Sequence, residues 1–307
     1  MKIIAVVDLG SNSFKVSVVD VLQQKELGRQ TESIRIFPEN GSHTIMPPDV
    51  IKAATEAVNR LVTFARDKGA EKIVILGTSA LRECTNVTAF SDELRKSTGI
   101  ALLTISGEVE ARLASEGVRT DPDYTSYNSI LGFDLGGGSL EIFELRGKHC
   151  TLAKSLPLGS VRLTHGLLQG ARGIIGQGQQ EYFQSEILES LQKVIPTNAA
   201  ENSIIIGGGG AFAAIAMHLE AVGEKPVGGR LPVLRIRELK DKMCQQSSEQ
   251  RRSVPGIPAD RVDIMPAALL TICLLADLTK AESFYISYRG VRHGMMQVLS
   301  RDQGGLI

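Results

Sequence analysis

The sequence predicts an α/β protein built from two similar domains, and three observations support this fold class. Strand-like and helix-like segments alternate along the chain, as in sheets that are covered by helices. A length of 307 residues suits two domains of about 150 residues each. The third observation is a repeated turn. "VVDLGSNSFKVSVVD" begins at Val6, "LGFDLGGGSLEIFEL" begins at Leu131, and both contain Asp-Leu-Gly followed by a serine. We therefore expect a duplicated fold with a cleft between its halves.

The first domain is predicted to open with two strands rich in valine and isoleucine, which flank the first turn as an antiparallel pair. A helix is expected from the Pro47-Pro48 pair to about Lys68, because apolar residues recur there on one helical face. The expected strands are Lys2–Asp8, Phe14–Val21, Glu26–Ile36, Lys72–Leu76 and Ala101–Ile105. The two further helices are Asn86–Ser97 and Glu108–Gly117, the second ending at its glycine.

A domain boundary is predicted within residues 119–127, which carry turn residues and no apolar period. Domain I is assigned to residues 1–124 and domain II to residues 125–289. The expected strands of domain II are Ser129–Asp134, Leu140–Leu145, Cys150–Ser155, Ser203–Ile206 and Ser283–Ile286. Its expected helices are Ser160–Leu168, Gly178–Val194 and Ala211–Leu219, the last following four consecutive glycines, and a final helix is expected at Val291–Leu299.

Composition narrows the class of partner and the compartment. Lys+Arg and Asp+Glu both count 34, which argues against general nucleic-acid binding. The four cysteines are far apart and form no CxxC pair, as expected of structural cysteines in a reducing compartment. The longest apolar run, Ile264–Ala276, contains Pro266 and is shorter than the ~20 residues that span a bilayer. The start of the chain lacks the segments of a signal peptide. A soluble cytoplasmic protein with no membrane partner is expected.

The two glycine turns are candidate phosphate-binding loops. Glycine lets a ligand approach the backbone closely, and successive amides in such a turn form a concavity that binds phosphate oxygens. Side-chain donors are added by Ser11, Asn12, Ser13 and Ser139. The aspartate before each turn suggests a Mg²⁺ or a water between it and the phosphate. The alternative is a pair of plain tight hairpins, in which such residues are routine. The double occurrence favours phosphate binding.

Two further polar clusters follow predicted strands, where ligand sites of α/β sheets lie. Ser79 and Arg82 come after one buried strand, and Glu108 and Glu110 begin the helix after the next. Glu108 is interpreted as compensating the helix dipole. Glu110 lies further into the helix and is expected to face the cleft.

With these residues assembled, the chain resembles the exopolyphosphatase/guanosine pentaphosphate phosphohydrolase (Ppx/GppA) family. The motifs that carry the resemblance occur in family order from residue 8 to residue 296, and they are "DLGSNSFK", "GTSALRECTN", "ISGEVEARL", "DLGGGSLE", "SLPLGSVRLT", "IGGGGAF" and "RGVRHGMM". The resemblance implies an actin-like fold of two RNase-H-like domains, with a C-terminal helix at about 290–307 that packs back on domain I. Longer members add further domains, so this chain resembles the short two-domain form.

The resemblance also implies roles for individual residues. The family's catalytic glutamate falls on Glu110, the expected base for water attack on the terminal phosphorus. A Mg²⁺ or another divalent cation is expected on Asp134 and Glu141, with Asp8 acting through water. The expected phosphate-binding residues are Gly10, Ser11, Asn12, Ser13, Lys15, Arg82, Gly136, Gly137, Gly138 and Ser139.

Three positions depart from the family pattern. Val109 stands where the first of two adjacent acids is usual, and Ala211 stands where a threonine is usual. Lys15 stands where the family often has histidine or arginine, so its positive charge is kept and bidentate geometry is lost.

Outside these motifs, arginines receive structural interpretations. Arg162 is expected to reach either a phosphate or loop carbonyls. Arg289 and Arg292 are expected to form salt bridges to domain I. The patch of Lys225, Arg230, Arg235 and Arg237 is interpreted as a solvated basic face, with an extension of a polyphosphate track as the alternative.

Four functional hypotheses follow. The first is a Mg²⁺-dependent exopolyphosphatase that releases orthophosphate from inorganic polyphosphate. The second is a 5′-phosphohydrolase of guanosine pentaphosphate (pppGpp), which Ala211 makes less favoured. An actin-like kinase fits poorly, because "ISGEVEARL" provides no sugar-binding acid. A non-catalytic sensor of polyphosphate or a nucleotide is the fourth. A homodimer is expected from the family alone.

Overall fold

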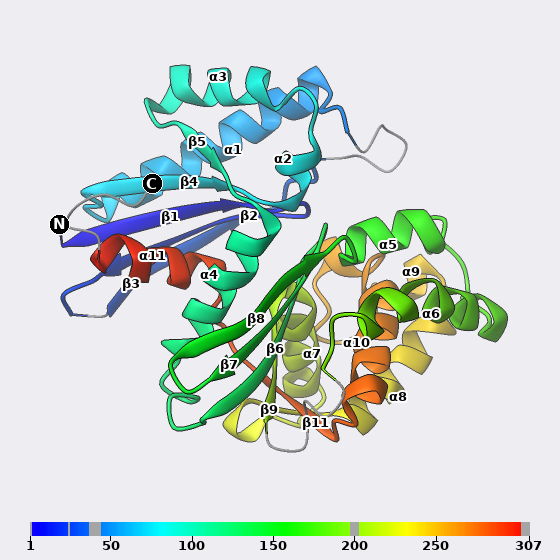
Figure 1. Ribbon diagram of the computed structural model, residues 1–307. Coiled ribbons are helices and arrows are strands. Elements are labelled where there is room, and N and C mark those ends of the chain that lie inside the picture. Colours follow the sequence, from blue (N-terminus) through cyan, green and yellow to red (C-terminus); the bar gives the residue numbers. More distant parts are fainter. Residues whose placement is uncertain (1, 24, 37–43, 197–202, 302–307) are drawn as a thin grey trace. The chain divides into compact units, whose positions relative to one another are not determined.

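The computed structural model describes residues 2–23, 25–36, 44–196 and 203–301 (Figure 1). These residues form two compact units. Unit 1 comprises the residues up to Gly117 together with those from Val291 onward, and unit 2 runs from Val118 to Gly290. Residues 302–307, which the predicted C-terminal helix included, lie outside the described part of the chain.

Unit 1 contains a mixed sheet whose strand order is β3-β2-β1-β4-β5. The strands are β1 (Ile3–Leu9), β2 (Phe14–Asp20), β3 (Lys25–Glu32), β4 (Lys72–Gly77) and β5 (Leu102–Thr104). β1, β2 and β3 are antiparallel neighbours, as expected of runs joined by tight turns, whereas β4 and β5 run parallel to β1. The first glycine turn therefore lies at the edge where the parallel strands end, which is where α/β sheets bind ligands.

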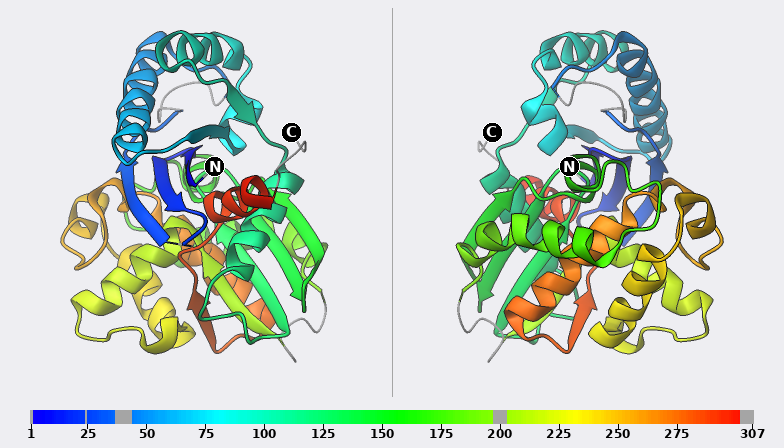
Figure 2. Two further views of the ribbon diagram at one scale, coloured as in Figure 1. Left: turned by 90° about the vertical axis from the view of Figure 1, so that its left-hand side faces the viewer. Right: turned by 90° about the vertical axis from the view of Figure 1, so that its right-hand side faces the viewer.

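Helices cover both faces of this sheet. They are α1 (Pro48–Asp67), α2 (Ser79–Glu83), α3 (Val87–Thr98), α4 (Gly107–Arg119) and α11 (Val291–Arg301). Ala5 and Val7 of β1 pack with buried residues of α1. Asp8 projects from the opposite face, because side chains alternate along a strand, and Arg292 of α11 reaches it there. Two further views show α1 and α11 on opposite sides of the strands (Figure 2).

The close packing of α11 on α4 leads to a first prediction. A Cβ atom at Gly294 would overlap the backbone of Leu113, so alanine at this position must push the two helices apart. We expect Gly294→Ala to lower the free energy of unfolding by about 1–3 kcal/mol, as measured by urea denaturation. Gly178→Ala is the matched control, because Gly178 faces open space in a helix and its replacement should cost nothing. A Gly294→Ala protein as stable as wild type would contradict this account.

Unit 2 contains a sheet whose strand order is β10-β11-β9-β6-β7-β8. The strands are β6 (Ser129–Leu135), β7 (Leu140–Arg146), β8 (His149–Leu156), β9 (Ile204–Gly208), β10 (Arg230–Pro232) and β11 (Ser283–Ile286). Its α-helices are α5 (Ser160–Leu167), α6 (Gln177–Gln192), α7 (Gly209–Ala221), α8 (Val233–Cys244), α9 (Ser248–Arg251) and α10 (Met265–Thr279).

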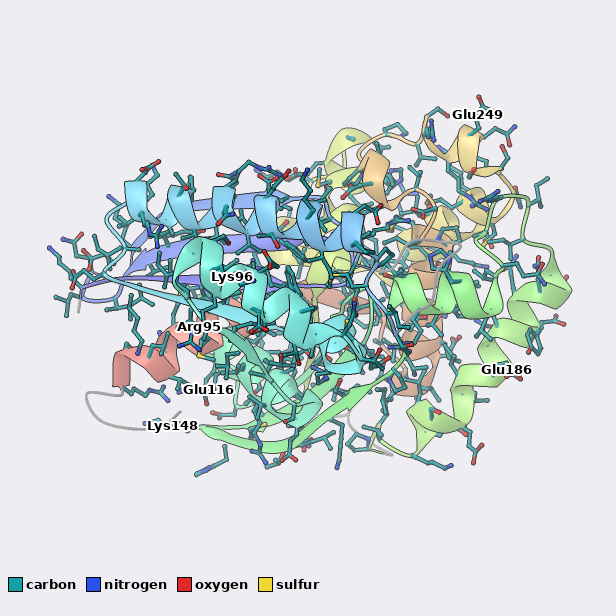
Figure 3. All side chains as sticks on the ribbon, turned by 90° about the horizontal axis from the view of Figure 1, so that it is seen from above. Arg95, Lys96, Glu116, Lys148, Glu186 and Glu249 are labelled. Carbon is teal, nitrogen blue, oxygen red and sulfur yellow. The ribbon has the colours of Figure 1, made fainter. Side chains whose placement is uncertain are left out.

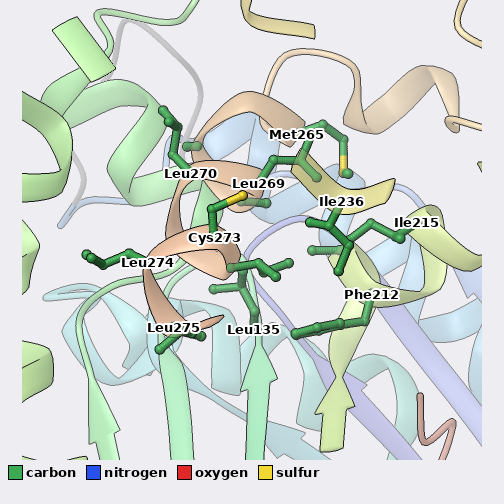
Figure 4. Close-up of a cluster of buried hydrophobic side chains, with 14 of the residues drawn as sticks. Leu135, Phe212, Ile215, Ile236, Met265, Leu269, Leu270, Cys273, Leu274 and Leu275 are labelled. Atoms are coloured by element: carbon green, nitrogen blue, oxygen red, sulfur yellow. The ribbon is translucent and has the colours of Figure 1, made fainter. Parts of the chain in front are cut away.

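The core of unit 2 forms around α10, which corresponds to most of the longest apolar run of the sequence. Almost every residue of α10 is buried, so the helix is apolar all round because other elements enclose it. Leu135 of β6, Phe212 of α7 and Ile236 of α8 lie around it (Figure 4). No helix within the described residues is long and apolar enough to cross a membrane.

The two sheets share one topology, which confirms the predicted duplicated RNase-H-like fold. Without β10, the second sheet reads β8-β7-β6-β9-β11, and this matches β3-β2-β1-β4-β5 strand for strand. In both sheets the first three strands are antiparallel and the later two run parallel to the first.

Three local predictions were wrong. The strand expected at Glu26–Ile36 ends at Glu32. α4 does not end at Gly117 but continues to Arg119, because a glycine costs a helix only about 1 kcal/mol and packing can compensate for it. The three residues of β10 were not predicted as a strand, since a segment of that length carries no readable period.

The two segments that link the units are hydrogen-bonded to each other within unit 2. The hydroxyl of Tyr124 donates to the carbonyl of Ile286 at 2.6 Å, and that of Ser287 donates to Oδ2 of Asp121 at 2.7 Å. The domain boundary proposed from the sequence at 124/125 stays a prediction, and unit 2 of the structure begins at Val118.

The surroundings of the cysteines favour a structural role. All four are free, and Cys84, Cys244 and Cys273 are buried. Burial raises the pKa of Cys244 and that of Cys273 to about 11. Little reactive thiolate therefore forms at these two positions near neutral pH.

Candidate active site

The first glycine turn, residues 10–13, connects β1 to β2, and two of its carbonyl oxygens accept hydrogen bonds. The amide of Gly10 donates to the carbonyl of Ser13 at 3.2 Å, and the amide of Ile36 donates to the carbonyl of Ser11 at 3.4 Å. Ser11, Asn12 and Ser13 are all buried. Within the described part of the chain, the amides of these three residues donate to no backbone acceptor. This turn therefore has donors to offer an anion.

The second glycine turn, residues 136–139, repeats the same internal bond, with the amide of Gly136 donating to the carbonyl of Ser139 at 3.0 Å. Its other carbonyls accept hydrogen bonds from the start of α5. Ser160 donates its amide to Gly136 at 2.9 Å, and Val161 donates its amide to Gly137 at 2.9 Å. The first amides of a helix lack partners within the helix, so both groups are satisfied by this contact.

In the second turn the carbonyl groups accept hydrogen bonds, whereas most of the amide groups donate to no backbone acceptor in the described part of the chain. Arg162 donates its Nε to the carbonyl of Gly138 at 3.0 Å, so the carbonyls of all three glycines are engaged. Among the residues that the structure describes, the amides of Gly137, Gly138 and Ser139 donate to no backbone acceptor. Both turns thus combine engaged oxygens with amides left for a ligand.

The residues that precede and follow each turn give the two turns different charges. In the antiparallel register Asp8 lies opposite Lys15, whereas Asp134 lies opposite Glu141. Side chains directly opposite on neighbouring strands project from the same face of a sheet. The aspartate of the first turn therefore has the cationic Lys15 as its neighbour, whereas the aspartate of the second turn has the carboxylate Glu141 in the equivalent position.

Asp8 already has a cationic partner. Arg292 of α11 places Nη1 3.3 Å from Oδ2 of Asp8 and donates its Nε to the hydroxyl of Ser17 at 3.0 Å. This confirms the salt bridge expected for Arg292. It also balances the charge of Asp8, so the role expected for Asp8 toward a metal, through water, stays a prediction.

The carboxylate of Asp134 is surrounded by glycines. A Cβ atom at Gly209 would lie 2.7 Å from its Oδ1, and one at Gly290 would lie 3.0 Å from its Oδ2. Because Gly209, in the β9–α7 turn, and Gly290 have no side chain, the backbone packs closely against this carboxylate.

The neighbouring Glu141 is buried, and Oε1 of its carboxylate accepts a hydrogen bond from the hydroxyl of Ser155 at 2.8 Å. Two acidic side chains on one face of the sheet suit a hard divalent cation. The described residues contain no group of three or more His, Cys, Asp or Glu residues arranged to hold a metal ion. These donors fit Mg²⁺, which commonly uses one or two carboxylates and completes its shell with water and substrate phosphates.

Glu110, the expected base, lies in the first turn of α4 and is buried. Its Oε2 lies 2.5 Å from Nη1 of Arg82, which also donates to the carbonyl of Ile105 at 3.1 Å. The hydroxyl of Ser106 accepts the amide of Val109 at 3.3 Å and so caps the helix. Val109 itself is exposed, so the departure from the usual acid lies on the outer side of α4.

Two residues near the ends of the parallel strands were not proposed from the sequence. The hydroxyl of Thr78 donates to the carbonyl of Leu9 at 3.1 Å and ties the end of β4 to the start of the first turn. In unit 2 the guanidinium of Arg261 lies against Gly210, where a Cβ atom would overlap it. Thr78 could have been found from the sequence, because it lies in the motif "GTSALRECTN". No local sequence pattern identifies Arg261.

The other arginines divide as follows. Arg162 contacts a loop carbonyl, one of its two expected partners. The salt bridge expected for Arg289 was wrong within the described residues, because Arg289 instead donates to the carbonyl of Thr120 at 2.5 Å, a neutral acceptor in the same unit.

Two of the four residues in the basic patch, Arg235 and Arg237, form ion pairs at the surface. Arg235 pairs with Glu224 and Glu238, and Arg237 pairs with Asp277 at 2.6 Å. These pairs favour the solvated-face interpretation. Other charged side chains, such as Glu186 and Glu249, point outward in the same way (Figure 3).

The chain is similar in sequence to known proteins. The chain is 28% identical over 309 aligned positions to an uncharacterised protein of Streptomyces coelicolor, covering 95% of this chain and 88% of that protein. It is 22% identical to a guanosine-5′-triphosphate,3′-diphosphate pyrophosphatase of Aliivibrio fischeri, covering 97% of this chain. It spans 60% of the length of that enzyme.

Solved structures share the fold. An exopolyphosphatase from Cytophaga hutchinsonii superimposes with a TM-score of 0.84 at 19% identity, covering 97% of both chains. A Ppx/GppA family member from Aquifex aeolicus superimposes with a TM-score of 0.80 at 19% identity, covering 98% of this chain and 99% of that one. The model of the Ppx/GppA phosphatase family matches residues 16–301. Because this match covers nearly the whole chain, the chain belongs to the Ppx/GppA phosphatase family.

Proposed function

We propose that the protein hydrolyses terminal phosphoanhydride bonds of inorganic polyphosphate and releases orthophosphate. The observation that carries the proposal is that, in both turns, carbonyl oxygens accept hydrogen bonds while amide groups remain available as donors. Each turn keeps three consecutive amides without a backbone acceptor among the described residues. A chain of phosphates offers many oxygen acceptors and little else, so oriented amide donors suit it.

Each turn has a different role in this proposal. The first turn binds phosphate oxygens through the amides of Ser11–Ser13 and through the charge of Lys15, with its aspartate balanced by Arg292. The second turn binds oxygens through the amides of Gly137–Ser139. Asp134 and Glu141 hold a Mg²⁺, which supplies positive charge to the oxygens around the reacting phosphorus when it is bound.

Glu110 is the proposed base. Its carboxylate orients a water molecule and accepts its proton as the new oxygen–phosphorus bond forms and the bridging oxygen–phosphorus bond breaks. Arg82 fixes the orientation of this carboxylate through the 2.5 Å ion pair. Nη1 of Arg82 is engaged by Glu110 and Ile105. For Arg82 to bind phosphate as well, either another nitrogen of its guanidinium must do so or its side chain must adopt a different conformation.

Guanosine pentaphosphate is the second candidate substrate. It shares the reaction centre, and the Aliivibrio relative is named for a guanosine substrate at 22% identity. Polyphosphate is preferred here because α7 begins with glycines and a buried alanine, Ala211, and so offers no hydroxyl near its start.

Phosphate release tests the proposal directly. Purified protein with Mg²⁺ should release orthophosphate from long-chain polyphosphate with a higher kcat/KM than from guanosine pentaphosphate. The reverse preference would replace the first substrate by the second. Binding of both without release would identify a sensor instead of an enzyme.

A metal prediction follows from the pairing of Asp134 with Glu141. We expect Glu141→Gln to raise the Mg²⁺ concentration for half-maximal phosphate release by at least about tenfold, because one of two anionic donors is lost. Glu144→Gln is the matched control, since Glu144 lies on the same strand and pairs with Arg146 at 2.6 Å. Equal Mg²⁺ requirements of the two variants would remove Glu141 from the metal site. Chelation by EDTA should stop release by the wild-type protein.

The cytoplasmic location, the homodimer and the absence of nucleic-acid partners stay predictions of the sequence analysis. Size-exclusion chromatography with light scattering measures the oligomeric state.

A further inference from the structure

Each glycine turn is contacted by an arginine from the segment that follows the third strand of its own unit. Arg35 lies in the loop after β3, and Arg162 lies in α5, the helix after β8. Nε of Arg35 donates to Oδ1 of Asn12 at 2.9 Å, and Nε of Arg162 donates to the carbonyl of Gly138 at 3.0 Å. When Asp8 is aligned with Asp134, Asn12 and Gly138 occupy the same position of the turn. The two units thus place the same donor on the same position, although one acceptor is a side chain and the other is backbone.

The amide of Asn12 has a fixed orientation as a result. A guanidinium has donors and no acceptor, so the oxygen of the amide must face Arg35 and its nitrogen must face the other way. That nitrogen is buried and has no hydrogen-bond partner in the described part of the chain. Asn12 as a whole is 5% exposed. Buried polar groups are nearly always paired, so an unpaired donor beside three unengaged amides points to a ligand acceptor.

We propose that Arg35 and Arg162 are positioning residues that hold the oxygen acceptors of the two turns away from the bound phosphates, so that donors alone face the anion. The proposal rests on the proposed function, because it assumes that the turns bind phosphate. Its physical basis is that an amide or carbonyl oxygen turned toward a phosphate oxygen repels it, whereas an N–H group attracts it. In this role neither arginine touches the substrate.

The role makes a distinctive prediction for Arg35. Without its guanidinium, the amide of Asn12 can rotate and present its oxygen to the phosphate. Arg35→Met should therefore lower kcat/KM for polyphosphate by about tenfold or more, through the loss of one donor and the gain of one repulsive acceptor. Asn12→Ala removes the same donor directly and should have a similar effect.

A double-mutant cycle separates this role from substrate contact. If Arg35 acts through Asn12, Arg35→Met in the Asn12→Ala background should cost less than twofold more. Additive losses would show that Arg35 acts independently of Asn12 and would overturn the proposal. Arg35→Lys keeps a donor and should recover part of the loss. Arg29→Met is the control for charge, because Arg29 lies on β3 with its side chain 70% exposed.

Amide hydrogen exchange in the protein without ligand provides a test that is independent of the reaction. The amide of Gly10, which is hydrogen-bonded to Ser13, should exchange faster in Arg35→Met than in Arg29→Met, and that of Gly136, which is hydrogen-bonded to Ser139, should exchange faster in Arg162→Met. Unchanged exchange in both turns would overturn the proposal. A wild-type protein that releases no phosphate would refute the proposed function, while the exchange comparison would still decide whether the arginines hold the turns.

Discussion

Replacing Glu110 by glutamine is expected to lower kcat for phosphate release by about 10²–10⁴-fold, the usual loss when a general base is removed. Glutamine has nearly the same shape and can still accept a hydrogen bond from Arg82, but it cannot take a proton from water. Because Glu110 is buried, with Arg82 beside it, the replacement removes the charge with little change in packing. We expect KM for polyphosphate to change little, since the amides of both turns remain. Steady-state release of orthophosphate measures both constants.

The control for this variant lies in the same helical turn. Glu108 is exposed and pairs with Arg112 at 3.0 Å, so Glu108→Gln should leave kcat within about twofold of wild type. If Glu110→Gln retained a tenth or more of the wild-type kcat, Glu110 would not be the base. A loss in both variants would instead indicate a general effect on α4.

A single methyl group at Gly159 is expected to disable the second turn. The backbone of Gly159 has φ −74° and ψ 152°, which any residue adopts, so conformation does not require glycine there. Space does, because a Cβ atom would overlap the backbone of Gly137 and Gly138. Gly159→Ala must therefore displace the turn. We expect kcat/KM to fall by about 10²-fold, the loss typical of a 1 Å misplacement, and the free energy of unfolding to fall by about 1–3 kcal/mol.

Gly166→Ala provides the comparison, because it adds the same methyl group to the same helix where nothing lies within 4 Å. It should leave both kinetics and stability close to wild type. If Gly159→Ala were as active as Gly166→Ala, the position of the second turn would not matter for the reaction.

The duplicated topology was predictable because its information is local and repeated. The apolar runs around Asp8 and Asp134 predict two hairpins, and the strands that follow each hairpin complete the same order in both sheets. Short segments were not predictable in this way. The strand Arg230–Pro232 exists only because β11 offers it backbone partners, and such a partner is not visible in the residues themselves.

The candidate site could be proposed from the sequence where its residues are contiguous, whereas contacts between distant residues could not be proposed in this way. The turns, Glu110 and Arg82 stand in short motifs next to strand ends. A salt bridge of Arg292 to domain I was expected, but its partner Asp8, 284 positions away, was not identified, and the contact of Arg35 with Asn12, 23 positions away, was not expected. No spacing rule links such residues, because the fold alone brings them together. The orientation of the Asn12 amide is likewise a property of its partner and not of its own neighbours.

The discontinuity of unit 1 has a consequence for synthesis. The chain leaves this unit at Gly117 and returns to it at Val291, after unit 2 has been made. On the ribosome, unit 2 therefore has all of its strands and helices available before α11 emerges. Unit 1 must wait with one face of its sheet uncovered and with Asp8 lacking the partner that Arg292 provides. Unit 2 can thus mature first, and the emergence of α11 then completes unit 1.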